Sequence, residues 1–356
     1  MCEKSITILF PIHGLVPRGG QKVAYEYANR LCRDGYELHI VYPALPFVDK
    51  QSFLRKIRMA LKYLFYRYIK GYSCRNWFNL DNRIREHYTY SLDWRYVPKT
   101  DYYIATAVET AMFLNTYPMP IQNKLYLIQG FENWRISDEC VKQTFNYGFK
   151  NIVVSNWLAK ILNSVGAKYT LIKNGFDFGY FRMDISFEER NTFKIAMMYS
   201  QQTCKGSEYG LKALAIVKEK YPALNVSLFG VHPKPAHLPD YIEYYQNPNR
   251  EVHNRIYNES SIFLASSIEE GWGLPVGEAM ICGCAVVCTD NKGFREMAED
   301  GVSALMSPIK DAESLADNII RLIEDDALRV RIAKNGHNNI QKFRWEDSYK
   351  KLKNLL

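Results

Sequence analysis

Long apolar runs are missing from the sequence. Nowhere among its 356 residues do about 18 apolar residues follow one another without interruption, which is the length a helix needs to cross a bilayer. The N-terminal stretch, MCEKSITILFPIHG, contains an acidic residue and lacks the basic start and longer apolar run of a signal peptide. It is better interpreted as a first strand. These absences predict a protein that is cytosolic or peripherally bound to a membrane.

The eight cysteines lack the spacing of a disulfide framework, which predicts reduced and mostly buried thiols. Three of them lie in the apolar run AMICGCAVVC with no fourth metal ligand nearby, so core packing is favoured over a metal site at Cys282, Cys284 and Cys288. Internal repeats and low-complexity tracts are also missing. With 47% hydrophobic residues, the chain can fill the cores of two domains.

Short β-branched or aliphatic runs alternate with segments of helical period along the chain. One series begins at SITILFPI (5–12) and a second at FKIAMMYS (193–200). Strands separated by helices of 10–15 residues predict parallel sheets with helices on both faces. The loop-like composition of 174–192 separates the two doubly wound α/β domains. The stretch 344–356 predicts a final amphipathic helix, whose solvated face is expected to hold Ser348, Lys350 and Lys353.

The stretch SSIEEGWGLPVGEAMICG (266–283) concentrates residues that bind ligands. A predicted strand leads to Glu270, after which Gly271 and Gly273 allow a tight turn and a close approach of the backbone to a ligand. The following proline suits the first turn of a helix, and a helix N-terminus suits an anion such as pyrophosphate. Glu278, one turn inside, can accept two hydroxyl hydrogen bonds from a ribose. The alternative is that both carboxylates are solvated and only stabilise the helix start.

The segment EGWGLPVGEAMICGCAVV resembles the glutamate–seven residues–glutamate motif of family 4 of the retaining glycosyltransferases, which have the two-domain GT-B fold. KNGFDFGYF (173–181) is similar to the family's linker, and 204–230 to its block of Lys-Gly, helix, proline and strand. In the N-terminal half, PRGGQKVAYEYANRLCRDGYELHIV and VVSNWLAKIL match. The resemblance implies two Rossmann-like domains facing a central cleft, 1–173 on the acceptor side and 174–340 for the nucleotide sugar, with helix 341–356 crossing back.

The family implies that a sugar is transferred, with retention of its anomeric configuration, from a nucleoside diphosphate donor without metal or cofactor. Glu270 would contact the donor sugar near its anomeric carbon, Lys205 would neutralise the phosphates and Glu278 would bind the ribose. The segment 244–251 would read the base. Backbone groups holding the sugar and the phosphates would come from Gly271, Trp272, Gly273 and Leu274, and from Gly19 and Gly20 of the other domain. A surface lysine remains the alternative for Lys205, and a plain turn the alternative for the glycine pair.

Two positions depart from the family's pattern. An arginine usually precedes the lysine by five or six residues, where this chain has Tyr199 or Ser200, and Arg18 or Arg295 could replace that cation. The usual acceptor-side histidine is replaced by Gln129, which can hydrogen-bond a sugar hydroxyl but cannot act as a base. The acceptor-side candidates are therefore His13, Gln129 and Glu132, with ordinary loop residues as the alternative.

Acidic residues are missing from Lys50 to Lys70, where seven Lys or Arg supply most of the net charge of +8, since 8 − 7 = +1. When the residues are placed around a helix at about 100° each, an apolar stripe falls within one arc of about 120° and the bases lie outside that arc. The stripe consists of Phe53, Leu54, Ile57, Leu61, Leu64, Phe65 and Tyr68. Three interpretations compete: a helix packed on the domain core, a nucleic-acid site, or docking on an anionic membrane.

Docking is favoured, because surface helices normally mix acids with bases and no nucleic-acid motif accompanies the charge. The bases assigned to it are Arg55, Lys56, Arg58 and Lys62. The leading hypothesis is a glycosyltransferase on the cytoplasmic face of a bacterial membrane that extends a lipid-linked glycan in polysaccharide biosynthesis. The alternatives are a transferase of the same fold with a soluble acceptor, and a catalytically silent module that binds sugar or membrane.

Overall fold

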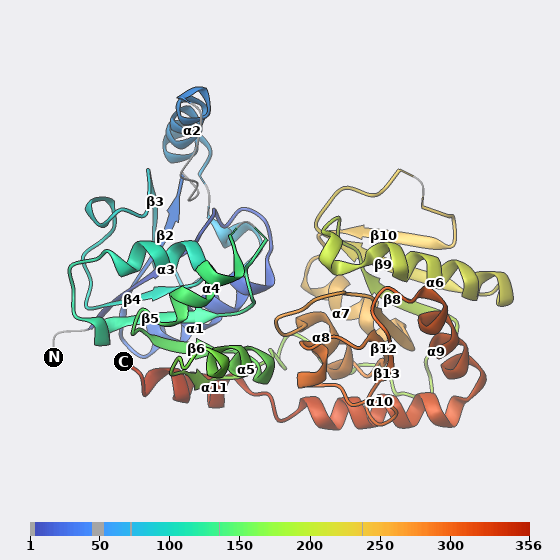
Figure 1. The fold of residues 1–356 in the computed structure, drawn as a ribbon. Coiled ribbons are helices and arrows are strands. Elements are labelled where there is room, and N and C mark those ends of the chain that lie inside the picture. Colours follow the sequence, from blue (N-terminus) through green and yellow to red (C-terminus); the bar gives the residue numbers. More distant parts are fainter. Residues whose placement is uncertain (1–3, 45–52, 72, 135, 237) are drawn as a thin grey trace. The chain divides into compact units, whose positions relative to one another are not determined.

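The chain forms two compact units, one made of residues 1–173 with 346–356 and one of residues 174–345. The computed structural model describes residues 4–44, 53–71, 73–134, 136–236 and 238–356 (Figure 1), apart from the side chains of residues 53–56, 59, 62 and 70. None of the helices in these ranges is both long and apolar enough to cross a membrane. Each unit is described by itself below.

The N-terminal unit is built on a parallel sheet with the strand order β3-β2-β1-β4-β5-β6-β7. Its strands are β1 (Ser5–Leu9), β2 (Glu37–Pro43), β3 (Arg85–Thr89), β4 (Tyr102–Ala105), β5 (Lys124–Ile128), β6 (Lys150–Val153) and β7 (Thr170–Leu171). Its helices are α1 (Gly19–Arg33), α2 (Phe53–Phe65), α3 (Val108–Asn115), α4 (Asp138–Phe145), α5 (Asn156–Ser164) and the final helix α11 (Trp345–Lys353). Figure 1 shows α2 standing out from the body of this unit.

The C-terminal unit repeats the plan with the strand order β10-β9-β8-β11-β12-β13, again all parallel. Its strands are β8 (Lys194–Met198), β9 (Asn225–Gly230), β10 (Ile242–Gln246), β11 (Ile262–Ala265), β12 (Ala285–Thr289) and β13 (Leu305–Ser307). Its helices are α6 (Ser207–Lys220), α7 (Arg250–Glu259), α8 (Leu274–Ile281), α9 (Ala312–Glu324) and α10 (Asp326–Ile340). Two parallel sheets with flanking helices confirm the predicted α/β class.

The central strands form where the sequence has uninterrupted apolar runs, because both of their faces are covered by helices. β11 and β12 are buried at every position. The strands β3 and β10 were not predicted. Both lie at an edge of their sheet and carry charged or exposed residues, so they lack the apolar run that marks a buried strand.

The final helix α11 packs on the N-terminal unit. Lys353 forms an ion pair with Asp34 at 2.6 Å, and the ammonium of Lys150 donates to the carbonyl of Leu355. The expectation that Ser348 is solvated is wrong. Ser348 is buried, and its hydroxyl donates to the carbonyl of Lys173 at 2.6 Å, because the helix turns this residue towards the end of the first domain.

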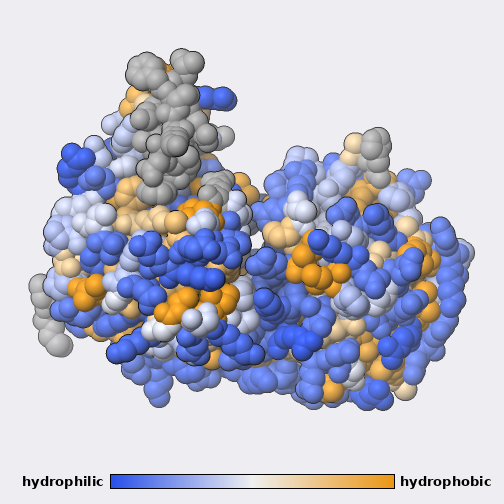
Figure 2. Space-filling view, viewed as in Figure 1, coloured by the Kyte–Doolittle hydropathy of each residue, from blue (hydrophilic) through white to orange (hydrophobic). Residues whose placement is uncertain are grey.

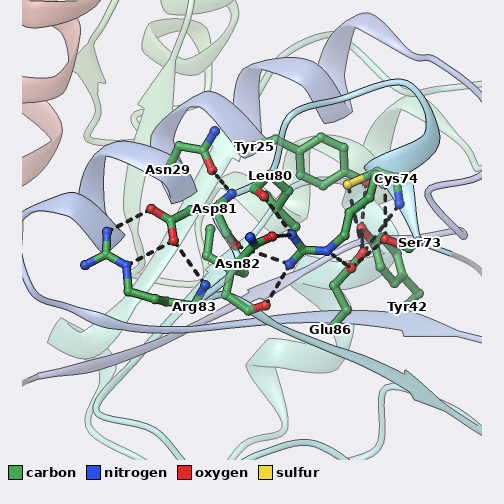
Figure 3. A network of polar contacts seen from close by, with 12 residues as sticks. Tyr25, Asn29, Tyr42, Ser73, Cys74, Leu80, Asp81, Asn82, Arg83 and Glu86 are labelled. Atoms are coloured by element: carbon green, nitrogen blue, oxygen red, sulfur yellow. Dashed lines mark hydrogen bonds and ion pairs between the residues drawn. The ribbon is translucent and has the colours of Figure 1, made fainter.

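A polar network fixes the chain that follows α2 to strand β3 (Figure 3). The carboxylate of Glu86 accepts hydrogen bonds from the hydroxyl of Ser73 at 2.6 Å and from the guanidinium of Arg75 at 3.0 Å. The same guanidinium donates to the carbonyl of Leu80 and to the side chain of Asn82. Several charge-assisted hydrogen bonds therefore hold the base of the projecting α2 in place.

Residues 174–192 lack helix and strand, as predicted, yet a buried arginine ties them to the C-terminal unit. The guanidinium of Arg190 donates to backbone carbonyls of its own segment and of the C-terminal ends of α7 and α8. These are the carbonyls of Ile185, Ser186, Tyr257, Ser260 and Cys282. The buried thiol of Cys284 donates to the carbonyl of Tyr257 at 3.0 Å, and burial raises the pKa of this thiol to about 11. This region is a polar but closed part of the core.

Replacing Arg190 with methionine is expected to lower the free energy of unfolding of the C-terminal unit by at least about 3 kcal/mol, because several buried carbonyls lose their donor. Urea unfolding followed by tryptophan fluorescence measures the change. The control Arg331→Met alters an exposed residue of α10 and is expected to change stability by less than about 0.5 kcal/mol. Equal stability of the two variants would contradict the role given to Arg190.

Candidate functional site

Lys205 and Glu270 meet at the carboxyl edge of the six-stranded sheet. Lys205 lies in the turn after β8 and Glu270 in the turn after β11, and β8 and β11 are neighbours. The ammonium lies 2.7 Å from a carboxylate oxygen of Glu270. The chain leaves β8 towards β9 on one side, while β11 lies on the other. The pair therefore sits where the strand order reverses, the usual place for ligands in open α/β sheets.

The two turns are joined through their backbones. The carbonyl of Cys204 accepts hydrogen bonds from the N–H groups of Ile268 at 2.8 Å and Glu269 at 3.2 Å. Gly206 has a φ of +55°, and a Cβ atom there would lie 2.2 Å from the carbonyl oxygen of Ser266. Only glycine fits this position, and the close approach is what brings Lys205 to Glu270.

The carboxylate of Glu270 is held from a second side by residues that sequence reasoning did not select. The hydroxyl of Ser267 donates to the same oxygen at 2.9 Å, and Asn291, just after β12, donates to the carbonyl of Ser267. A Cβ atom at Gly293 would lie 2.4 Å from the carbonyl oxygen of Glu270. The available signal was the stretch TDNKGF, in which an asparagine and a glycine follow a buried strand.

Lys205 keeps its proton around neutral pH. Burial by itself lowers the pKa of Lys205, but the nearby charge of Glu270 and the hydrogen bond between them outweigh it, so the pKa of Lys205 is raised above its ordinary value. The side chain of Glu270 is 9% exposed and that of Lys205 is 24% exposed. This partly open ammonium can therefore be offered to an anionic ligand.

Glu278 and the start of α8 lie in the same unit. Glu278 is buried in α8, and the hydroxyl of Tyr257 donates to its carboxylate at 3.4 Å. Desolvation and the charge of Glu278 raise the pKa of Tyr257, so this hydroxyl stays protonated and serves as a donor. The helix begins at Leu274 after Gly273, whose φ of +94° favours glycine. The second residue of the helix, Pro275, has no N–H, and the N–H of Val276 already donates to the carbonyl of Gly273 at 3.1 Å. What this terminus offers an anion is therefore mainly the positive end of the helix dipole.

Trp272, between the two motif glycines, points into the protein. Its ring packs edge-on against Phe343 with 5.4 Å between the ring centres, and the side chain is buried. Its indole N–H has no hydrogen-bond partner among the described residues. The side chain therefore supports the turn, and only backbone groups of Trp272 remain as ligand donors.

Arg295 and the segment 244–251 also belong to the C-terminal unit. Arg295, considered as a substitute for the missing arginine, forms an ion pair with Asp290 and keeps 66% of its side chain exposed. The segment 244–251 contains the end of β10 and the first turn of α7, which Asn249 caps by accepting from the N–H of Val252. Asn247 has a positive φ of 45° in the turn between them.

In the N-terminal unit, the glycine pair and Gln129 are brought together. Gly19 and Gly20 begin α1, and the amide of Gln129, just after β5, donates to the carbonyl of Gly20 at 3.0 Å. Gln21 donates to the carbonyl of His13 at 3.1 Å. The carboxyl edge of the seven-stranded sheet therefore gathers the N-terminal candidates. Arg18 precedes α1, and its Nη1 atom is buried without a hydrogen-bond partner in the described ranges.

Glu132 lies beside the start of α3. One of its oxygens accepts the N–H of Val108 at 2.8 Å, and the other has no hydrogen-bond partner among the described residues. Burial, with a smaller contribution from Glu109, raises the pKa of Glu132 to about 8, although the hydrogen bond opposes the shift. Tyr126 in β5 is the other titratable group close to this carboxyl. Glu132 is therefore a carboxylic acid with a pKa close to physiological pH.

The four basic docking positions belong to α2. Arg58 is exposed, whereas the side chains of Arg55, Lys56 and Lys62 lie outside the described part of the structure. The interpretation in which the apolar stripe packs on the domain core is wrong for its described members, because Ile57, Leu61, Leu64, Phe65 and Tyr68 are between 43% and 71% exposed.

Residues 183–339 match the model of the family "Glycosyl transferases group 1". The O-antigen chain mannosyltransferase B of Escherichia coli is 30% identical over 92 residues, which cover 26% of this chain and 24% of the relative. The phosphatidyl-myo-inositol mannosyltransferase of Mycolicibacterium smegmatis is 23% identical over 195 residues, 52% of this chain and 50% of the relative. The N,N'-diacetylbacillosaminyl-diphospho-undecaprenol alpha-1,3-N-acetylgalactosaminyltransferase of Campylobacter jejuni is 38% identical over 74 residues, 21% of this chain and 20% of the relative. The chain thus spans half or less of the length of these relatives.

Solved structures match over the whole chain. Sucrose-phosphate synthase from Thermosynechococcus elongatus and the Anabaena protein HepE in complex with UDP-glucose each have a TM-score of 0.72 and 16% identity. Both cover 99% of this chain, and the alignments span 98% and 99% of their own chains. This likeness confirms the predicted GT-B fold. The resemblance to glycosyltransferases is confirmed for the C-terminal unit at the level of the group 1 family.

The raised pKa of Glu132 predicts a stability that falls as pH rises. Between pH 4.5 and about 8 the folded chain keeps a proton on this carboxyl that the unfolded chain has lost, so each step upward in pH favours unfolding. Glu132→Gln, which can keep the hydrogen bond from Val108, is expected to melt at a higher temperature than wild type at pH 8 and at a similar temperature at pH 4.5.

Thermal unfolding across this pH range measures the difference, with Glu139→Gln on the exposed side of α4 as the control. Parallel pH profiles for wild type and Glu132→Gln would show that Glu132 is ionised at an ordinary pKa.

Proposed function

We propose that the protein is a retaining glycosyltransferase that transfers a sugar from a nucleoside diphosphate donor to a glycan acceptor. The observation that carries the proposal is the Lys205–Glu270 ion pair at the strand-order reversal of a domain that matches the group 1 family. It is supported by the positive dipole end of α8 and by Glu278 inside that helix. Metal independence is part of the proposal, because an ammonium and a helix N-terminus supply the positive charge that a departing diphosphate requires.

In the proposed reaction, the bond between the anomeric carbon and the diphosphate oxygen breaks, and the diphosphate leaves with the bonding electrons. The acceptor oxygen forms its bond to the same face of the anomeric carbon, and the acceptor proton passes to the departing phosphate. Lys205 and the positive dipole end of α8 stabilise the charge on the leaving group. Glu270 stabilises positive charge near the anomeric carbon, and Glu278 holds the ribose.

The acceptor is proposed to be a lipid-linked glycan of bacterial polysaccharide biosynthesis, extended at the cytoplasmic face of the membrane. The names of two relatives support it, since one is an O-antigen chain mannosyltransferase and another names a diphospho-undecaprenol substrate. His13, Gln129 and Glu132 are assigned to the acceptor side. A transferase with a soluble acceptor and a silent binding module are the competing functions.

The two members of the ion pair are expected to affect donor binding in opposite directions. Lys205→Met removes the ammonium and should weaken binding of the nucleoside diphosphate at least about 10-fold. Glu270→Gln releases Lys205 from its partner, so binding should be as tight or tighter, while kcat falls by about 100-fold or more because the anomeric carbon loses its stabilising charge.

Isothermal titration calorimetry and donor turnover measure these effects, with EDTA present to test metal independence. Glu269→Gln is the matched control, since it changes the adjacent exposed carboxylate and should leave both quantities near wild type. A wild-type protein that binds nucleotide but neither transfers nor hydrolyses any donor would be a silent module, and the enzyme proposal would be wrong.

The nucleotide is identified by thermal unfolding in the presence of UDP-, GDP- and dTDP-sugars. A ligand present at about 100 times its Kd stabilises the folded state by about 2.7 kcal/mol, enough to separate the true donor from the others. Because the structurally similar HepE was solved in complex with UDP-glucose and with UDP, UDP-sugars are the first to test. If no nucleotide sugar raises the melting temperature, the donor site is misassigned.

A further inference from the structure

We infer that α2 and the turn that extends it form a docking surface for an anionic lipid bilayer. The helix continues from Phe53–Phe65 through a wider π-helical turn, Tyr66–Lys70, so the whole rod is about 25 Å long. It stands out from the body of the N-terminal unit (Figure 1). Because the inference concerns where the protein binds, it holds or fails independently of the proposed transfer reaction.

The outward side of this rod is apolar. Leu61 is 63% exposed, Tyr68 is 71% exposed and Ile69 is 76% exposed, and Ile57 and Leu64 are exposed by more than 40%. Isolated exposed apolar residues are common on proteins, but a contiguous row of them marks an interaction site. Where α2 is coloured in the space-filling view, both hydrophobic and hydrophilic residues reach its surface (Figure 2).

The opposite side of the rod is attached to the protein. Tyr63 stacks on Tyr88 of β3 with 5.6 Å between ring centres, and Tyr66 packs against both Tyr88 and His13 at 6.4 Å. At about 100° per residue, Tyr63 and Tyr66 each lie about 150° from the middle of the described apolar stripe, one on either side of the opposite face. Core packing therefore uses the tyrosine side, and the apolar stripe is left for another partner.

The charges on the rod indicate which kind of partner it binds. Arg58 and Arg67 are both exposed. The guanidinium of Arg67 donates to the hydroxyl of Tyr63 and lies 5.5 Å from the ring centre of Tyr68, so it is positioned between the tyrosine side and the apolar stripe. From Lys50 to Leu80 the sequence contains no acidic residue. An apolar stripe next to basic residues matches a bilayer surface, where bases meet anionic headgroups and apolar side chains enter the interface.

Other occupants fit less well. A second copy of this chain would bring two surfaces with the same positive charge together, which costs free energy. A nucleic acid would use the bases but leave the apolar stripe in water. An anionic lipid surface satisfies both groups.

The docking surface also leads to the acceptor side of the N-terminal unit. Tyr66 stacks on His13, whose carbonyl accepts from Gln21 next to the Gly19–Gly20 pair. Below the rod, the Glu86 network fixes the returning chain, as described above. Direct side-chain and backbone contacts therefore connect α2, which is proposed to bind the bilayer, with the sheet edge where a lipid-linked acceptor is proposed to bind.

Sedimentation with lipid vesicles, without any donor sugar, tests the inference. Vesicles of phosphatidylcholine with about 30% phosphatidylglycerol are compared with phosphatidylcholine alone. Wild type should bind the anionic vesicles and only weakly the neutral ones. Changing Arg55, Lys56, Arg58 and Lys62 together to Glu should weaken binding at least about 100-fold, since each base near the surface contributes about a factor of five.

The matched control changes four exposed bases elsewhere to Glu, namely Lys234, Arg331, Lys350 and Lys351. Both variants lower the net charge from +8 to 0, since +8 − 8 = 0, so only the location of the change differs. The control is expected to lose less than about 5-fold. Equal losses in the two variants would mean that binding reflects net charge alone, and the inference would be wrong.

A second pair of variants tests the apolar stripe. The first variant combines Leu61→Ser, Leu64→Ser and Tyr68→Ser. It should abolish the vesicle binding that survives at high salt, because this salt-resistant binding depends on apolar insertion. The matched control replaces the exposed residues Ile216, Val302 and Ile309 with serine. A different result would overturn the inference: wild type binds a short DNA duplex but no vesicles, and the α2 variants lose the DNA binding. That result would identify a nucleic-acid surface.

Discussion

The parallel direction of all strands in each sheet is the constraint on which the rest of the structure depends. Each crossover returns the chain to the same starting edge, so every strand delivers its following turn to the opposite edge. Lys205 and Glu270 are 65 residues apart in sequence, yet they follow neighbouring strands and meet at 2.7 Å. In the N-terminal unit, the same rule brings Gly20 to Gln129. The order and direction of the strands therefore bring these residues together, although they are far apart in the sequence.

Much of this arrangement could be predicted from the sequence. The buried strands are apolar throughout, and the glycines and proline of the EGWGLP stretch mark a turn into a helix, so β11, α8 and the position of Glu278 were predictable. The contacts of Ser267 and Asn291 were not, because they depend on how the turns after β11 and β12 fold on each other. The burial of Ser348 was missed for a related reason, since its partner is the carbonyl of Lys173.

The helix α2 shows a different limit of sequence reasoning. The spacing of its apolar residues predicts the helix and the stripe correctly, but a stripe looks the same whether it faces a core or solvent. The deciding information lies in Tyr63 and Tyr66, whose aromatic contacts with β3 and His13 take over the packing role. In the sequence, tyrosines on the polar side of a basic helix do not indicate that this side packs on the domain.

The Lys205–Glu270 ion pair also weakens the electric field that either charge alone would project into the solvent. An ammonium 2.7 Å from a carboxylate presents a dipole whose field fades within a few ångströms, so free phosphate passing at a distance feels little attraction. A ligand must come close enough to compete for the ammonium, and it must offer the carboxylate a new partner in return. Under the proposed function, the pair favours molecules that carry a diphosphate and a hydroxylated ring together over the inorganic anions that are abundant in a cell.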